Sequence, residues 1–390
     1  MDDRPFLIAG GGIAGIAASL ALARINRRSE VFERAAAFEE AGAGLQMSPN
    51  AVHCLRLLGA WDAIEPHCVI PSEIHIRDGR SGRVLRRIGL GKPFEVRFGS
   101  PYRVAHRADL LRGLVQTAQR ASGIALHTGK AVESAETTDH GARLHFTNGQ
   151  AAEGSAVIAA DGINSVIRNA IVGGGEPSCR GHAIYRALLP FDKVPLSIAA
   201  DCVTLWLYPG GHAVHYAVSN WRQFNMVAVL ENPWREDGWG IETGKAEVVD
   251  GFADAADALA QLLTSVPAWT KFAAAGHAPS NKWVSGHVAL IGDAAHASLP
   301  YLAQGAAMAL EDACVLAKCL DAGSATPSAL MDYARLRMPR TARIQHESRR
   351  LGSIYHARGI PALARNALLR VTGTQQGFRR NQWIYDWKPQ

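Results

Sequence analysis

The chain begins with two hydrophobic runs of different length, separated by glycines. Residues 6–9 are uniformly apolar, and residues 13–23 carry almost only small and aliphatic side chains. The short run is typical of a buried parallel strand, whereas the longer one predicts a helix packed on a sheet. A second short strand is expected at residues 30–32, ending at Glu33. The pattern therefore predicts a strand–turn–helix–strand unit.

Amphipathic patterns of two kinds follow. Residues 51–58 and 106–121 have helical periodicity. Residues 73–98 alternate between polar and apolar side chains, and the turn sequences Asp78-Gly79 and Ser81-Gly82 interrupt them, which predicts a hairpin. Further short strands are expected at residues 124–127, 131–136, 143–146 and 156–159.

The middle of the chain changes character at residues 181–231. This stretch alternates, is rich in aromatic and β-branched residues, and is interrupted by Pro-Gly-Gly at 209–211, so it predicts an antiparallel sheet in a separate, substrate-side domain. Residues 246–275 are expected to be helical. A final strand at 288–291 returns to the first domain, and helices are expected at 305–320 and 328–356.

Together these elements predict an α/β fold with three parts. The first is a discontinuous, Rossmann-like dinucleotide-binding domain, the second an inserted α+β domain of mainly antiparallel sheet, and the third a C-terminal helical segment. The expected boundaries are 1–72 with 100–180 and 281–325 for the first, 73–99 with 181–280 for the second, and 326–390 for the third.

Composition narrows the function classes. The 390 residues are 48% hydrophobic with a net charge of +6, which describes a globular protein whose basic surface would attract anionic cofactors and substrates. No dense run of Lys and Arg suggests nucleic acid as a partner. The apolar stretch 6–23 is short and glycine-containing, so we expect no signal peptide or membrane span, and a cytoplasmic protein. The six cysteines are scattered, which favours free thiols over a zinc site.

The glycines between the first strand and helix carry the first chemical signal. Gly10, Gly12 and Gly15 have G-x-G-x-x-G spacing and lead through Ile13 and Ala14 into the helix. The first glycine allows a tight turn, the second lets a pyrophosphate approach the backbone, and the third lets helix and strand pack closely. The helix N-terminus offers free N–H groups to phosphates. Glu33 at the end of the second strand is placed to bind a ribose diol, so the unit predicts dinucleotide binding.

Two later segments place aspartates after apolar strands. Asp161-Gly162 follows the strand that begins at residue 157, and Gly292-Asp293 follows the strand at 288–291. Ligands of open parallel sheets bind at the carboxyl ends of strands, where these side chains can accept hydrogen bonds from sugar hydroxyls. The alternative is that each aspartate caps a following helix.

Taken together, the three segments resemble the group A flavoprotein monooxygenases, the aromatic hydroxylases of the p-hydroxybenzoate hydroxylase type, whose cofactor domain is of the glutathione-reductase type. The resemblance covers roughly residues 1–320. It is greatest to the branch of salicylate hydroxylase, 3-hydroxybenzoate 6-hydroxylase and 6-hydroxynicotinate 3-monooxygenase. The supporting segments are GAGLQMSPNA at 42–51, HRADLL at 106–111, PYLAQGA at 300–306 and WIYDW at 383–387. The chain departs from the common Gly-Gln-Gly of the flavin loop at Ala303.

This resemblance implies FAD as cofactor and NADH or NADPH as a transient co-substrate. The implied FAD contacts are Glu33 and Arg34 at the adenosine end, Val132 at the adenine, Arg107 at the pyrophosphate or ribityl region, Asp293 at the ribityl chain, Asp161 at both FAD and the nicotinamide donor, and Pro300 with Gly305, Ala306 and Ala307 beside the isoalloxazine. The N–H groups of the helix from Gly305 would stabilise negative charge on reduced flavin. The chain shows no second glycine-rich unit for the nicotinamide donor.

The implied reaction transfers oxygen from a C4a-hydroperoxyflavin to a phenolic or hydroxypyridine-type aromatic acid. His212 and Tyr216 match a His-x-x-x-Tyr pairing of the 3-hydroxybenzoate 6-hydroxylase-like branch that binds or deprotonates the substrate hydroxyl. Residues four apart on a strand share a face, so both can line one pocket, whereas His215 would face the other way. The alternative is that all three side chains only stabilise the sheet. Further candidate substrate contacts are Gln46, Tyr185, Arg186 and Pro300.

Other functions on the same scaffold stay open. An FAD-dependent oxidase or dehydrogenase would not insert oxygen into its substrate. A flavin halogenase would carry a Trp-x-Trp-x-Ile-Pro signature, and here Trp206 is followed by Leu-Tyr-Pro. A prenyl-GTPase chaperone of the GDP-dissociation-inhibitor kind shares the fold, but the intact Asp161 and Asp293 elements disfavour it. We expect a monomer or homodimer whose partners are a small aromatic substrate and O₂.

Overall fold

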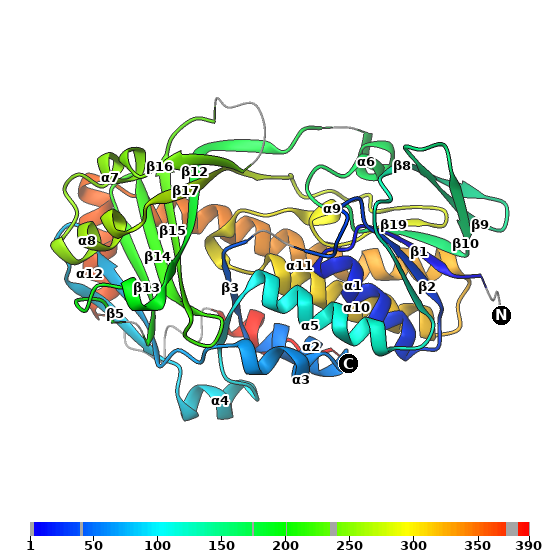
Figure 1. The fold of residues 1–390 in the computed structure, drawn as a ribbon, viewed down its shortest axis with the longest axis horizontal. Coiled ribbons are helices and arrows are strands. Elements are labelled where there is room, and N and C mark those ends of the chain that lie inside the picture. The colour runs from blue at the N-terminus through cyan, green and yellow to red at the C-terminus, as the bar shows by residue number, and fades with distance from the viewer. Residues whose placement is uncertain are drawn as a thin grey trace.

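Two sheets of different character lie at opposite ends of the molecule, with helices between and along them (Figure 1). The structure is a computed structural model, and it describes residues 4–39, 42–173, 175–199, 201–234, 240–371 and 381–389.

The first sheet has six strands, of which five run parallel. Its strands in spatial order are β18 (Val284–Ser285), β19 (Val288–Leu290), β11 (Ala156–Ala159), β1 (Phe6–Ala9), β2 (Ser29–Phe32) and β7 (Ile124–His127). The two central strands, β1 and β11, are buried at every position because helices or strands cover both faces, which explains their uniformly apolar sequence.

Helices pack against this sheet and against one another. Helix α1 (Ile13–Arg24) lies between α10 (Gly305–Asp321) and α5 (Arg107–Arg120), and its small residues allow close approach. The neighbouring short helices are α2 (Pro49–Leu57), α3 (Trp61–Ile64), α6 (Val166–Arg168), α9 (Asp293–His296), and the helical turns η1 (Glu65–His67), η2 (Asn169–Gly173) and η4 (Pro300–Leu302).

Two small sheets complete this end of the molecule. One is a meander of β8 (Val132–Thr138), β9 (Gly141–Phe146) and β10 (Ala151–Gly154). The other pairs β3 (Gly44–Met47) with β6 (Arg103–His106).

The second large sheet has eight strands. In spatial order they are β16 (Ile241–Gly244), β17 (Ala268–Gly276), β12 (Ser178–Pro190), β15 (Gln223–Glu231), β14 (Gly211–Val218), β13 (Cys202–Tyr208), β4 (Glu73–Asp78) and β5 (Val84–Gly89). All neighbours are antiparallel except β13 and β4, which run parallel. The segment 73–89 therefore joins strands that follow it by more than a hundred residues. Helices α4 (Lys92–Phe98), α7 (Ala246–Gly251), α8 (Asp257–Ser265) and the turn η3 (Phe191–Lys193) accompany this sheet.

Two sequence predictions about these elements are wrong. The alanine-rich residues 268–275 are strand β17 rather than helix, because they pair with β12 and alternate between buried and partly exposed positions at their start. Residues 92–98 form α4 instead of continuing the hairpin. Pro93 suits the first turn of a helix, and Gly99 ends it with a φ of 73°.

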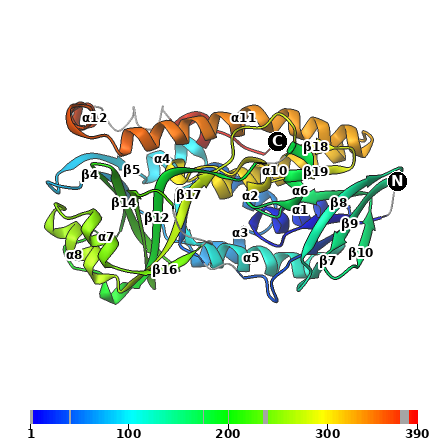
Figure 2. The same ribbon diagram turned by 90° about the horizontal axis from the view of Figure 1, so that it is seen from above.

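The C-terminal helix α11 (Thr326–Tyr355) runs alongside both parts of the molecule (Figure 2). Near its middle, the buried Arg337 guanidinium contacts Glu311 at 2.8 Å and Asp312 at 2.7 Å, both fully buried in α10. His296 Nε2 donates a hydrogen bond to the Asp312 carboxylate in the same network. This network fixes α11 on α10. Helix α12 (Gly359–Val371) follows α11 and lies beside the second sheet.

The α/β fold class predicted from the sequence is confirmed, with a mainly parallel first sheet, a mainly antiparallel second sheet and C-terminal helices. The proposed boundaries between domains stay a prediction. Among the described residues, no helix combines the length and apolar character needed to cross a membrane.

Candidate active site

A large cavity of about 640 Å³ extends from the glycine-rich turn to the second sheet. This volume suits a sizeable organic ligand. Its walls include the predicted residues Gly10, Gly12, Ile13, Ala14, Glu33, Arg34, Gln46, Arg107, Val132, Asp161, Arg186, His212, Tyr216, Asp293, Pro300, Gly305 and Ala306. The fold therefore brings most of the predicted cofactor and substrate residues to one continuous space.

The glycine-rich turn is tight enough to require glycine. Gly10 has a φ of +104°, and a Cβ atom there would lie 2.4 Å from the carbonyl oxygen of Ala160 on the neighbouring strand end. Gly15 does not line the cavity. A Cβ on it would lie 1.9 Å from the Gly10 carbonyl oxygen, so this glycine lets α1 pack on the turn. The turn is thus a cradle in which backbone, not side chains, faces a ligand.

One end of the cavity is suited to an adenosine group. The Glu33 carboxylate accepts hydrogen bonds from the backbone N–H groups of Gly11 at 2.8 Å and Ala35 at 2.9 Å. These bonds fix the carboxylate at the end of β2, where its remaining lone pairs can accept from ribose hydroxyls. Arg34 and Val132 line the cavity beside it.

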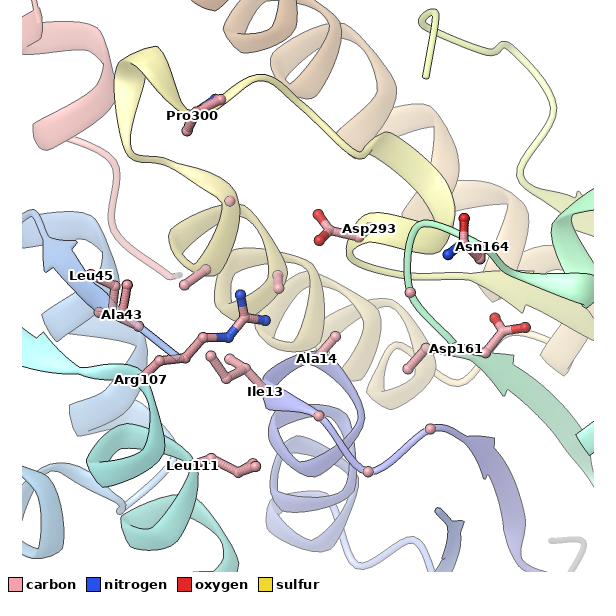
Figure 3. Close-up of a pocket in the computed structure, with 18 of the residues that line it drawn as sticks. Ile13, Ala14, Ala43, Leu45, Arg107, Leu111, Asp161, Asn164, Asp293 and Pro300 are labelled. Carbon is pink, nitrogen blue, oxygen red and sulfur yellow. The ribbon is translucent and has the colours of Figure 1, made fainter. Parts of the chain in front are cut away.

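The middle of the cavity combines charges from distant segments. Arg107 at the start of α5 and Asp293 at the start of α9 direct their charged groups into the same open space (Figure 3). Asp161 follows β11, and its Oδ1 atom is buried without a hydrogen-bond partner among the described residues. Burial raises the pKa of Asp161, although hydrogen bonds from Ser165 and nearby backbone oppose this. Its Oδ2 atom lies 3.5 Å from the backbone nitrogen of Ile167, so the carboxylate is directed toward the first turn of α6, as the capping alternative expects.

The first turn of α10 forms another wall. Gly305 and Ala306 line the cavity, as does Pro300 in the preceding turn. The side chain of Ala307 is buried in the core behind the cavity, so its predicted place beside the cofactor concerns its backbone alone and stays a prediction. Only its backbone N–H belongs to the unbonded first turn of the helix, which favours a negatively charged group in front of it. Ala303 adopts the left-handed conformation (φ 53°) just before this helix.

The opposite wall is the face of the second sheet. His212, Val214 and Tyr216 on β14 all line the cavity, as their spacing of two residues requires. Ile184 and Arg186 line it from β12. His215 points to the other face, where it packs near Trp206 and Phe224.

Tyr216 is 3% exposed and is held by polar neighbours. Burial raises the pKa of its hydroxyl, while the positive charge of Arg186 and a hydrogen bond with Gln46 act in the opposite direction. Gln46 is itself oriented by Tyr102, whose hydroxyl donates to Gln46 Oε1 at 2.6 Å. The Tyr216 hydroxyl is therefore neutral and fixed in direction before any ligand arrives.

His212 is held from behind by a residue that the sequence did not suggest. Its Nδ1 atom lies 2.8 Å from Nε2 of His356, the residue that follows α11. Burial lowers the pKa of His212 well below its ordinary value, and His356 and His182 lower it further. His212 is therefore neutral, and its unprotonated nitrogen can accept a hydrogen bond. No local pattern around His356 signals this contact. Asn164 and Leu299 are further cavity residues that the sequence did not indicate.

The prediction that Tyr185 contacts the substrate needs correction. Because neighbouring residues of a strand face opposite sides, Tyr185 points away from the wall that Ile184 and Arg186 form. It is fully buried in the core behind the sheet, and its hydroxyl accepts a hydrogen bond from Asn232 at 3.2 Å.

The parallel sheet, the glycine cradle and the carboxylates at the strand ends define a dinucleotide-binding flavoprotein with an adjoining substrate pocket. Comparison with known proteins agrees. Residues 3–348 match the model of the FAD binding domain family, and the chain belongs to this family.

Individual relatives and solved structures extend this likeness over nearly the whole chain. The chain is 36% identical to a 3-hydroxybenzoate 6-hydroxylase of Polaromonas naphthalenivorans over 387 residues, covering 99% of this chain and 96% of that protein. It is 35% identical to the 3-amino-4-hydroxybenzoate 2-monooxygenase PtnB3 of Streptomyces platensis, covering 97% and 94%. Klebsiella pneumoniae HpxO complexed with FAD and uric acid is a structural neighbour at 27% identity and a TM-score of 0.86, covering 98% and 96%.

These findings confirm the prediction of an FAD-dependent aromatic monooxygenase. FAD is its cofactor, and the cavity fits it, because the glycine cradle and the fixed Glu33 carboxylate line the same cavity into which Arg107 and Asp293 direct their charged groups.

Proposed function

We propose that this protein hydroxylates a small benzoate-type acid that carries a ring hydroxyl, using NADH or NADPH and O₂. The observation that carries the proposal is the group of His212, Tyr216 and Arg186 on one wall of the cavity that also contains the cofactor cradle. The names of the relatives, which act on 3-hydroxybenzoate and 3-amino-4-hydroxybenzoate, support the same substrate class.

Two neutral side chains suit the substrate hydroxyl. His212 is neutral, because burial lowers the pKa of this imidazole, so it can accept a hydrogen bond from the substrate hydroxyl. Because an imidazolium is disfavoured there, His212 takes the proton only while its Nδ1 atom gives one to His356. Tyr216 keeps its own proton and can donate a hydrogen bond to the resulting phenolate oxygen. An ionised hydroxyl makes the ring electron-rich, which is the state that attacks an electrophilic oxygen.

Arg186 supports recognition of the carboxylate. It lines the cavity from β12, close enough to Tyr216 for its charge to affect the pKa of that hydroxyl. Arginine binds carboxylates through two parallel hydrogen bonds, which fixes both position and orientation. The remaining wall includes Ile184, Val214 and Val227, which suit an aromatic ring and exclude water.

The cofactor residues have separate tasks in this proposal. Glu33, Arg34 and Val132 would hold the adenosine end, and Arg107 and Asp293 the middle of the molecule. The first turn of α10 would face the flavin ring with its N–H groups. When bound, FAD supplies hydride acceptance from the nicotinamide and transfer of one oxygen atom from O₂.

A substrate panel tests the proposal. Purified protein with FAD is mixed with NADH or NADPH and with salicylate, the hydroxybenzoates or hydroxypyridine carboxylates in turn. We expect one of the hydroxybenzoates to stimulate nicotinamide oxidation. It should yield a dihydroxylated product in an amount nearly equal to the nicotinamide oxidised. Stimulation by none of them, or stimulation with hydrogen peroxide as the only product, would refute it.

A further inference from the structure

Three histidines from three separate segments form a hydrogen-bonded row behind the substrate wall. His212 Nδ1 lies 2.8 Å from His356 Nε2, and His356 Nδ1 lies 3.0 Å from His182 Nε2. His356, in the middle, therefore bonds to one neighbour through each of its two ring nitrogens. Imidazoles joined in this way can pass a proton along, because each ring nitrogen can act as donor or acceptor.

The row leads from the cavity toward the surface. His212 lines the cavity and is 4% exposed, and His356 behind it is 5% exposed. His182 on β12 is partly exposed and stands directly opposite Glu231 on β15. One ligand atom each of His182, Glu231 and His356 lies within 4.8 Å of the other two.

The outer end of the row has an unused position. The Nδ1 atom of His182 is buried and has no hydrogen-bond partner among the described residues, so a proton on it reaches solvent only when the ring turns. A rotation of this partly exposed ring would present that nitrogen to Glu231 or to water. Glu231 is an exposed carboxylate, so it can take up a proton at this point and release it to solvent.

We propose that His212, His356 and His182 form a proton path between the substrate hydroxyl and solvent. The inference rests on the proposed hydroxylation. The substrate O–H bond breaks and its proton goes to His212 Nε2. His212 Nδ1 gives a proton to His356 Nε2, and His356 Nδ1 gives one to His182 Nε2. The His182 ring then turns, and its Nδ1 atom releases a proton to Glu231 or water. The substrate loses one proton, solvent gains one, and each imidazole remains neutral in its other tautomer.

The same row can run in reverse when the product leaves. A proton returns to the oxygen that lost it, and all three rings recover their first tautomer. The product then dissociates as a neutral phenol, and the ring hydrogen replaced during hydroxylation leaves separately as a proton.

The surrounding charges favour transfer without a resting cation. Burial, followed by the charges of His182, Arg365 and Arg358, lowers the pKa of His356 to about 3. Burial lowers the pKa of His182, and the charge of Glu231, which pairs with Arg358, opposes this shift. A positive imidazolium in the middle of the row is therefore unstable, and a proton that enters it passes on.

The backbone holds the middle ring in place. The Gly210 N–H donates to the carbonyl oxygen of His356 at 3.1 Å, and Arg365 donates to the carbonyl oxygens of Ile354 and Tyr355 at the end of α11. These contacts fix His356 independently of its side chain, so a glutamine there can occupy the same place.

The alternative is that the row only tethers α11 to β14, and the rate of substrate ionisation separates the two. The probe is 3-hydroxy-4-nitrobenzoate, whose phenolate absorbs visible light. It is mixed in a stopped-flow instrument with the FAD-loaded protein, at a pH where the phenolic hydroxyl of the free probe keeps its proton. A glutamine at position 356 can form hydrogen bonds to both neighbouring histidines, but its amide group does not pass a proton between them. We expect H356Q to slow phenolate formation about tenfold or more, with unchanged FAD content.

Two further variants complete the test. H182Q is expected to slow ionisation less than H356Q, because water can reach the outer end, and added imidazole is expected to restore part of the rate. The matched control is His145→Gln. His145 is a partly exposed residue of β9, and this variant should behave as wild type.

Equal ionisation rates in wild type, H356Q and H182Q would overturn the proton path, as would failure of the wild-type protein to ionise the probe. Loss of thermal stability in H356Q with an unchanged rate would assign the row to tethering alone. Normal ionisation without any hydroxylated product from 3-hydroxybenzoate would instead remove the proposed function.

Discussion

The substitution Tyr216→Phe removes a single oxygen atom from the substrate wall. In the native protein this hydroxyl is buried and held by Gln46, and it faces the cavity next to Arg186. Phenylalanine keeps the ring and its packing. Gln46 keeps its 2.6 Å hydrogen bond from Tyr102, so its carbonyl oxygen is not left unpaired. We therefore expect a change in the free energy of unfolding of no more than about 1 kcal/mol.

The effect on catalysis should be larger. A hydrogen bond to a charged oxygen contributes about 1.5–3 kcal/mol, and about 1.4 kcal/mol corresponds to a tenfold change. Loss of the bond to the substrate phenolate should therefore slow hydroxylation by about 10- to 150-fold. Because the cofactor cradle is untouched, FAD content should stay unchanged.

The assay compares three quantities in the same reaction: nicotinamide oxidised, O₂ consumed and aromatic product formed. Tyr216→Phe should still oxidise the nicotinamide, while a larger share of O₂ appears as hydrogen peroxide. Turnover and product yield within twofold of wild type would refute the role assigned to Tyr216.

Three other changes probe the remaining parts of the site. Gly10→Ala should abolish tight FAD binding, because the left-handed backbone and the Ala160 carbonyl oxygen 2.4 Å away leave no room for a methyl group; retention of FAD after desalting would contradict this. Arg186→Gln should weaken binding of the aromatic acid by about 10- to 150-fold, measured by titration of the flavin absorbance, with little effect on a substrate analogue that lacks the carboxylate. Lowering the pH from 7 to 5 should destabilise the fold through His356, because its pKa falls from 6.5 to about 3 on folding and the unfolded chain then binds the extra proton. This contributes about 2 kcal/mol at pH 5, and chemical denaturation should show a smaller loss in H356Q.

Local patterns were enough to predict the cofactor end. The run 6–33 places strand, turn, helix and second strand in immediate succession, so each element packs on its neighbour in sequence. Strand β17 was missed because its alanines favour a helix in isolation, whereas pairing with β12 decides the outcome.

The substrate wall depends on finer information. The two-residue periodicity of a strand predicts that His212 and Tyr216 share a face, and they do line the cavity together. The same rule allows only one of Tyr185 and Arg186 to face it. His356 lay beyond prediction, because it reaches His212 across 144 residues of sequence through the packing of α11. A contact of that kind leaves no local trace.

The most direct test of the central claim is to follow the oxygen atom. The FAD-loaded protein is supplied with NADH or NADPH, the hydroxybenzoate that stimulates turnover, and ¹⁸O₂, and the product is weighed by mass spectrometry. Incorporation of one labelled oxygen into the aromatic product is the expected result. An unlabelled product, with all of the label in hydrogen peroxide or water, would contradict it.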